Sequence, residues 1–236
     1  RKCSFCPNSY LDRFSNNKRM SDAVFENIIS GLQEIKYNKT LLWSYFHEPF
    51  ADESIFPRLI FARKALPNAK LKIISNGDKL TQDMLKYLES IKLDCLRISY
   101  YPGRDELDDN RRLNEKVSEF VSLLGLKMVP IATDEYALKG SRIYISLLIQ
   151  NFYRKKPYSR AGAIKEKEKY LRKAICERPL HHVVIDHSGN GMLCCETRSD
   201  YPPHKKAIIG NLAISGYGIF ELYRDMAPWR RSVLTK

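Results

Sequence analysis

The feature that most constrains the fold of this chain is a regular alternation of short apolar runs with amphipathic segments. The apolar runs are short and bounded by polar residues, which favours strands. They lie at residues 41–46, 71–74, 96–99 and 126–131. Apolar residues at three- and four-residue spacing favour helices between them. The helical segments are residues 21–35, 55–63, 81–91 and 113–124. The alternation predicts parallel strands with helical crossovers, hence an open α/β sheet or a full or partial barrel.

Polar residues follow the predicted strands directly. The triplet His47-Glu48-Pro49 closes the first strand, Ser75-Asn76-Gly77 closes the second, and Ser99 ends the third. In α/β sheets and barrels of parallel strands, functional groups gather at the carboxyl ends of the strands. We therefore expect the site at this edge. Ser21 and Thr81 stand where the N-caps of two helices are expected.

Length and composition argue against a disordered chain. With 236 residues, 44% of them hydrophobic, the chain can bury a full core. No stretch approaches the roughly 20 apolar residues of a membrane span, the longest runs being short ones such as Ile143 to Ile149. The first residues lack the layout of a secretory signal. We therefore expect a cytoplasmic location without membrane association, and six cysteines that are thiols or metal ligands.

The charge is strongly basic. Forty Lys and Arg residues against 27 Asp and Glu residues give a formal net charge of +13. Such an excess favours acidic partners, whether nucleic acid, phosphorylated metabolites or a carboxylate-rich peptide. Charges of both signs crowd residues 165–173, which is typical of a solvated helix surface.

The character of the sequence changes after Gly162. A lysine-rich segment is followed by Val183 to Ile185, the turn Ser188 to Gly191, and Met192 to Cys194, a pattern that predicts a β-hairpin. We place a boundary near residue 165. Residues 1–165 are then the main domain, and residues 166–236 are a small C-terminal domain that ends in a short helix.

Cys3 and Cys6 are separated by two residues. This spacing lets two thiolates bind one metal centre, as in zinc sites, redox pairs and iron-sulfur clusters. A zinc ribbon needs a second close pair, but the other local pair, Cys194-Cys195, is adjacent. A redox pair fits badly, because Cys6 leads into Pro7 and not into a helix after a strand. Cluster ligation remains.

The order of these motifs resembles the radical S-adenosylmethionine (SAM) superfamily. The resemblance rests on Cys3-Ser4-Phe5-Cys6, then helix, strand, His47-Glu48-Pro49, strand and Ser75-Asn76-Gly77. It implies a partial (β/α)6 TIM-like barrel. It also implies a 4Fe-4S cluster on three cysteines, the first of which would lie just before Arg1. Phe5 would be the aromatic residue of the motif, and one iron would bind SAM.

The same resemblance assigns cofactor-binding roles. Glu48 would pair with the ammonium of SAM, and His47 replaces a glycine usual in that loop. Ser75, Asn76 and Ser99 would bind its ribose or carboxylate, although polar residues also end strands for backbone reasons alone. In the segment that would follow the sixth strand, Arg160 is a candidate for the SAM carboxylate.

The C-terminal cysteines resemble the opening of a SPASM or twitch domain, which holds auxiliary 4Fe-4S clusters. Cys176 and Cys194 would be ligands, and the remaining ligands would lie beyond Lys236. The alternative is two buried thiols. Cys195 is a candidate for a catalytic hydrogen-atom donor, and Cys95 is expected in the core.

The resemblance implies an enzyme that cleaves SAM reductively and abstracts hydrogen from its substrate, with an electron donor such as flavodoxin or ferredoxin. Maturation of a peptide is the leading expectation. Dehydrogenation, epimerisation or dehydration of a sugar or aminoglycoside is the alternative. An alternative of another class is a zinc-stabilised nucleic-acid binder that uses the basic run 154–160. This alternative leaves the other motifs unexplained, so nucleic acid is not the expected partner.

Overall fold

The computed structural model describes residues 3, 5–11, 19–102, 110–150, 160–164 and 175–234. The chain divides into two compact units, which are described separately below. One comprises residues 37–156, and the other comprises residues 1–36 and 157–236. The boundary predicted near residue 165 lies outside the described residues and stays a prediction, as does the lysine-rich helix.

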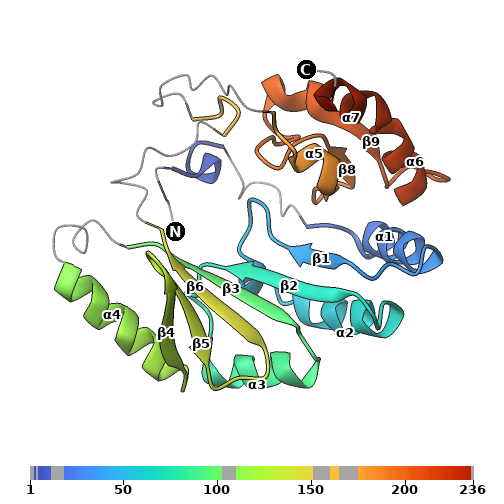
Figure 1. The fold of residues 1–236 in the computed structure, drawn as a ribbon. Coiled ribbons are helices and arrows are strands. Elements are labelled where there is room, and N and C mark those ends of the chain that lie inside the picture. The colour runs from blue at the N-terminus through green and yellow to red at the C-terminus, as the bar shows by residue number, and fades with distance from the viewer. Residues whose placement is uncertain are drawn as a thin grey trace. The chain divides into compact units, whose positions relative to one another are not determined.

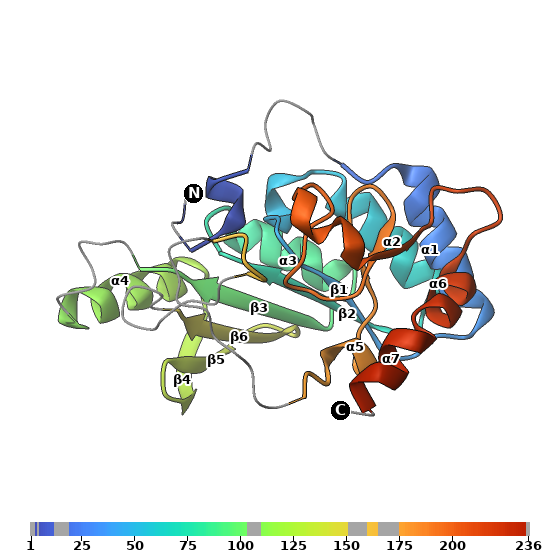
Figure 2. The ribbon, with the colours of Figure 1, turned by 90° about the horizontal axis from the view of Figure 1, so that it is seen from above.

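The unit of residues 37–156 is built on a six-stranded sheet (Figure 1). Its strands are β1 (Thr40–Trp43), β2 (Lys70–Ser75), β3 (Cys95–Tyr100), β4 (Lys127–Ala132), β5 (Glu135–Lys139) and β6 (Tyr144–Ile149), in the order β1-β2-β3-β6-β5-β4. β1, β2, β3 and β6 are parallel. Figure 2 shows β3 and β6 side by side. The predicted α/β class is confirmed.

Helical crossovers join the first three strands. The helices of this unit are α2 (Ile55–Ala65), α3 (Gln82–Ser90) and α4 (Asn110–Leu123), with the short 3-10 helix η2 (Pro49–Ala51) after β1. Thr81 caps α3 as predicted, because its hydroxyl accepts from Met84 N at 3.2 Å. Alternate residues of the central strands are almost fully buried. They are Leu71, Ile73, Leu96, Ile98, Ile145 and Leu147. Period-two burial therefore gives the sheet one face in the core.

One connection differs from the simple alternation. β4 and β5 pair antiparallel, as do β5 and β6. Only two residues, Thr133 and Asp134, separate β4 from β5, and such a short turn can join only antiparallel strands. Asp134 takes the left-handed conformation that this turn requires, with φ of 60°. The strand predicted at 126–131 exists, but no helix follows it.

The other unit contains a small antiparallel sheet. Its strands are β7 (Val184–Ile185), β8 (Asn190–Met192) and β9 (Ile208–Asn211). The predicted hairpin is β7 and β8. Asp186, only 4% exposed, holds its turn by accepting from Ser188 N and Asn190 N, each at 2.9 Å. Gly189 completes the turn with φ of 82°.

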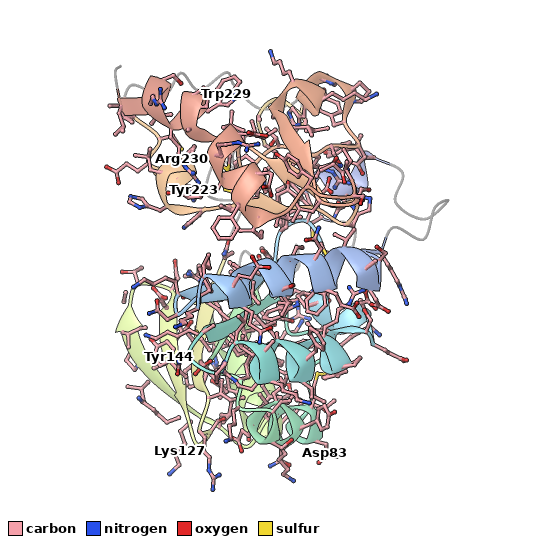
Figure 3. The ribbon with its side chains drawn as sticks, turned by 90° about the vertical axis from the view of Figure 1, so that its right-hand side faces the viewer. Asp83, Lys127, Tyr144, Tyr223, Trp229 and Arg230 are labelled. Atoms are coloured by element: carbon pink, nitrogen blue, oxygen red, sulfur yellow. The ribbon has the colours of Figure 1, made fainter. Side chains whose placement is uncertain are left out.

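Helices accompany this sheet. They are η1 (Pro7–Ser9), α1 (Asp22–Glu34), α5 (Arg178–His181), η4 (Pro202–Ala207), α6 (Ile219–Asp225) and α7 (Ala227–Leu234). Ser21 caps α1, as predicted. Asn27 ties α1 to the β9–α6 loop by donating to the carbonyls of Leu212 and Tyr217. The guanidinium of Arg230 lies 3.9 Å from the centre of the Tyr223 ring, which joins α7 to α6 (Figure 3).

Gly191 in β8 has no room for a side chain. A Cβ there would overlap Leu222, which is fully buried in α6. We expect Gly191→Ala to lower the free energy of unfolding by about 1–3 kcal/mol, the usual effect of overpacking. Chemical denaturation measures this loss. In the double variant Gly191→Ala/Leu222→Ala the loss should be smaller than the sum of the two single losses; simple additivity would contradict the overlap.

No helix in the described part of the chain is long and apolar enough to cross a membrane.

Candidate active site at the strand ends

Glu48 joins the carboxyl ends of β1 and β2. It is the N-cap of η2, and its Oε1 accepts from Phe50 N at 3.2 Å. The same oxygen accepts from the hydroxyl of Ser75 at 2.7 Å, and Oε2 accepts from Asn76 N at 2.7 Å. Three of the predicted site residues are therefore brought together. A carboxylate has about four acceptor positions, so Glu48 keeps capacity for one further donor such as an ammonium group.

Ser75 acts through Glu48. Its side chain is buried, with 2% of the residue exposed, and its hydroxyl also accepts from Gly77 N at 3.0 Å. Because its one donor is directed at Glu48, Ser75 orients that carboxylate. A direct contact of Ser75 with a ribose or carboxylate stays a prediction, as does one of Asn76. His47 is exposed and lines a small pocket of about 50 Å³ with Trp43 and Arg58.

Ser99 ends β3 in a buried position, with 4% of the residue exposed. The side-chain amide of Gln150 donates to its hydroxyl at 3.5 Å, and Gln150 N donates to Tyr100 O at 2.8 Å. Sequence reasoning missed Gln150. The available signal was a polar residue directly after the apolar run of residues 143–149, the same signal that singled out Ser75 and Ser99.

Cys3 and Cys6 lie on one turn of the other unit. Cys6 N donates to Cys3 O at 2.9 Å, and the hydroxyl of Ser9 donates to the same carbonyl at 2.7 Å. Both thiols are free and half-buried, whereas Phe5 between them is buried. Two thiolates on one turn fit two ligand positions of an iron-sulfur cluster. No group of three His, Cys, Asp or Glu residues able to hold a metal occurs among the described residues, so the ligand set stays a prediction.

Cys194 and Cys195 follow β8 and lie beside two arginines. Arg178 donates to the Cys195 sulfur at 3.0 Å and to Glu196 at 3.2 Å. Arg160 donates to the other oxygen of Glu196 at 2.6 Å. The contact with the Cys194 thiol, and then Arg178, lower the pKa of Cys195 to about 6. The contact with Cys195, and then burial, raise the pKa of Cys194. Arg160 is thus engaged by Glu196, and its contact with a SAM carboxylate stays a prediction.

The two remaining cysteines are half-buried thiols. Cys176 lies just before α5, and its sharing of a cluster with Cys194 stays a prediction. Cys95 opens β3 and is half-buried, so the expectation that it lies in the core was wrong; its partial burial raises its pKa.

Comparison with known proteins supports the fold. No protein-family model and no curated protein sequence matches the chain. A crystal structure of BtrN in complex with AdoMet and 2-DOIA matches with a TM-score of 0.72 at 17% identity, over 99% of this chain and 81% of that chain. Selenomethionine BtrN in an open conformation matches with a TM-score of 0.63 at 16% identity, over 99% and 79%.

The chain has the fold of a radical SAM partial barrel. The fold prediction is thereby confirmed, including the small antiparallel sheet. In barrels of parallel strands functional groups gather at the carboxyl ends of the strands, and in this chain those ends carry Glu48, Ser75, Asn76, Ser99 and Gln150. The SPASM or twitch character of the C-terminal part stays a prediction.

Loss of the Ser75 hydroxyl should disorient Glu48. If Glu48 binds the ammonium of SAM, as the sequence resemblance implies, Ser75→Ala should weaken SAM binding about tenfold, because a hydrogen bond to a charged group contributes about 1.5–3 kcal/mol and Phe50 N and Asn76 N still hold the carboxylate. Equilibrium dialysis with labelled SAM measures the change. The exposed Ser90 serves as control, and equal affinities of the Ser75→Ala and Ser90→Ala variants would refute the role.

Proposed function

We propose that this chain is a radical SAM enzyme that abstracts hydrogen from a small polar substrate such as a sugar or an aminoglycoside precursor, and that it oxidises that substrate. The observation that carries the proposal is the fold match over 99% of the chain to BtrN, a protein crystallised with AdoMet and 2-DOIA. That match favours a small-molecule substrate over the peptide expected first from the sequence.

In this proposal Glu48 holds the ammonium of SAM. Ser75 and Asn76 N keep the carboxylate in place, and Ser99 with Gln150 forms a second polar group for the rest of the cofactor. Cys3 and Cys6 supply two cluster ligands. When bound and reduced by a flavodoxin or ferredoxin, the cluster with SAM supplies the hydrogen-abstracting radical.

The charge of the sheet favours an acidic or neutral substrate over a polycationic one. Lys72 pairs in register with Cys95, and Arg97 and Ser99 follow on the same face of β3. Both cations are half-buried, and neither forms a hydrogen bond or ion pair with another described residue. A phosphate or carboxylate on the substrate would compensate them.

Cys176 and Cys194 are proposed as ligands of at least one auxiliary 4Fe-4S cluster. Such a cluster would accept the second electron of a substrate dehydrogenation. The resemblance of these cysteines and the β7–β8 hairpin to the SPASM opening supports this assignment.

The test is purification without oxygen, followed by measurement of iron and sulfide and by incubation with reductant and SAM. We expect about eight irons per chain and release of 5'-deoxyadenosine, if each 4Fe-4S cluster is fully loaded. Sugars, aminoglycosides, their phosphorylated forms and peptides are then compared for substrate-dependent 5'-deoxyadenosine.

Each outcome decides between readings. If a sugar derivative increases the release of 5'-deoxyadenosine, the proposal is supported. If peptides alone increase it, peptide maturation becomes the better account of the function. Zinc without iron, together with absence of SAM cleavage, overturns both and favours the nucleic-acid binder.

A further inference from the structure

We propose that Arg198 is a positioning residue that links the turn carrying Cys3 and Cys6 to the loop that begins at Cys194. We call residues 194–204 the hub loop. The inference rests on the proposed function in treating these cysteines as cluster ligands. It goes beyond that function in making the geometry of one ligand set depend on the other.

The guanidinium of Arg198 is buried and held in one orientation. Only 8% of the residue is exposed. Its Nε and Nη2 donate to the two carboxylate oxygens of Asp200 at 2.8 and 2.6 Å. A bidentate pair of this kind fixes the plane of the guanidinium. The remaining nitrogen, Nη1, is thereby directed at its own partner, the side-chain oxygen of Asn8.

Asn8 belongs to the same short structure as the two cysteines. It lies in η1, two residues after Cys6. Cys3, Cys6 and Ser9 are joined by the hydrogen bonds to the Cys3 carbonyl. Any displacement of Asn8 therefore moves the turn on which both thiols stand.

The hub loop is anchored on its other sides. The hydroxyl of Thr197 donates to Cys194 O at 2.7 Å, and Arg198 N donates to Nδ1 of His204 at 3.0 Å. His204 is 4% exposed, and its Nε2 lies 2.9 Å from Ala161 O. Because the loop is held at these points, Arg198 cannot shift without strain elsewhere. A change of position at Cys194 is thus transmitted to Asn8 and not absorbed locally.

The link is tested in anaerobically purified full-chain protein by hydrogen–deuterium exchange and by electron paramagnetic resonance of the reduced clusters with and without SAM. The variants are Arg198→Gln, Asn8→Ala and their combination. We expect amide exchange in residues 5–11 to accelerate about tenfold in each single variant, as loss of a hydrogen bond to a charged group implies. The double variant should exchange no faster than Arg198→Gln. The resonance signal of the SAM-binding cluster should change as well.

Two variants separate positioning from simple stability. Arg198→Lys keeps the charge but lacks the planar fork, so it should not restore the wild-type signal. Arg63→Gln removes a comparable arginine, one that pairs with Asp94 in the other unit, and should leave both exchange in residues 5–11 and the resonance signal unchanged. If Arg198→Gln does not fold, Asp200→Asn releases the guanidinium more gently and takes its place.

The link would be overturned if amide exchange became faster only in residues 194–204 and the resonance signal of the SAM-binding cluster did not change. Arg198 would then stabilise only its own loop. The proposed function fails separately, if the wild-type protein holds zinc without iron and does not cleave SAM. In that case the exchange measurement still decides whether Asn8 and Arg198 are coupled.

Discussion

Replacement of both Cys3 and Cys6 by alanine is expected to abolish cleavage of SAM. The two thiols stand on one turn, and a cluster that loses two of its thiolates cannot assemble. Iron per chain should fall by about four, the content of one cubane cluster, and 5'-deoxyadenosine should drop to the level of the reaction without enzyme. Iron analysis and chromatography of the reaction products measure the two quantities.

Cys95→Ala is the matched control. Cys95 is also a half-buried free thiol, but it opens β3 and lies in the unit of residues 37–156. Its removal should leave iron content and SAM cleavage close to those of the wild type. If the Cys3→Ala/Cys6→Ala protein retains its full iron, the assignment of the cysteine turn as a cluster site is wrong.

Replacement of Glu48 by glutamine is expected to weaken SAM binding about 10- to 100-fold. The exchange keeps the size of the side chain but removes the negative charge, and a charge-assisted hydrogen bond contributes about 1.5–3 kcal/mol. The amide also replaces one acceptor oxygen by a donor, which opposes Ser75 Oγ or Asn76 N. The dissociation constant of SAM is the quantity to measure, with iron content as a check on cluster loading.

Glu53→Gln provides the comparison for Glu48→Gln. Glu53 lies five residues further along the chain and is exposed. The same loss of charge there should change SAM affinity less than twofold, since screened surface charges contribute little. Equal losses in both variants would mean that net charge and not the Glu48 contact governs binding.

Local patterns accounted for most of the fold. Short apolar runs and helical periodicity located β1, β2, β3 and the helices between them, and the caps at Ser21 and Thr81 were correctly placed. These features depend on neighbours within one turn or one strand. The missed features include β6, whose apolar run was not assigned as a strand, and also β5 and the antiparallel pairing of β4, which depend on a two-residue turn whose composition carries no strong signal.

The sequence by itself determined which residue types stand at the strand ends and that two thiols are spaced to share a metal, because these are properties of a few adjacent positions. Tertiary structure alone decided how those residues are held. Ser75 reaches Glu48 across 27 positions, Gln150 reaches Ser99 across 51, and Arg198 reaches Asn8 across 190. Such contacts arise only when packing of the core brings distant segments together, so periodicity and spacing cannot reveal them.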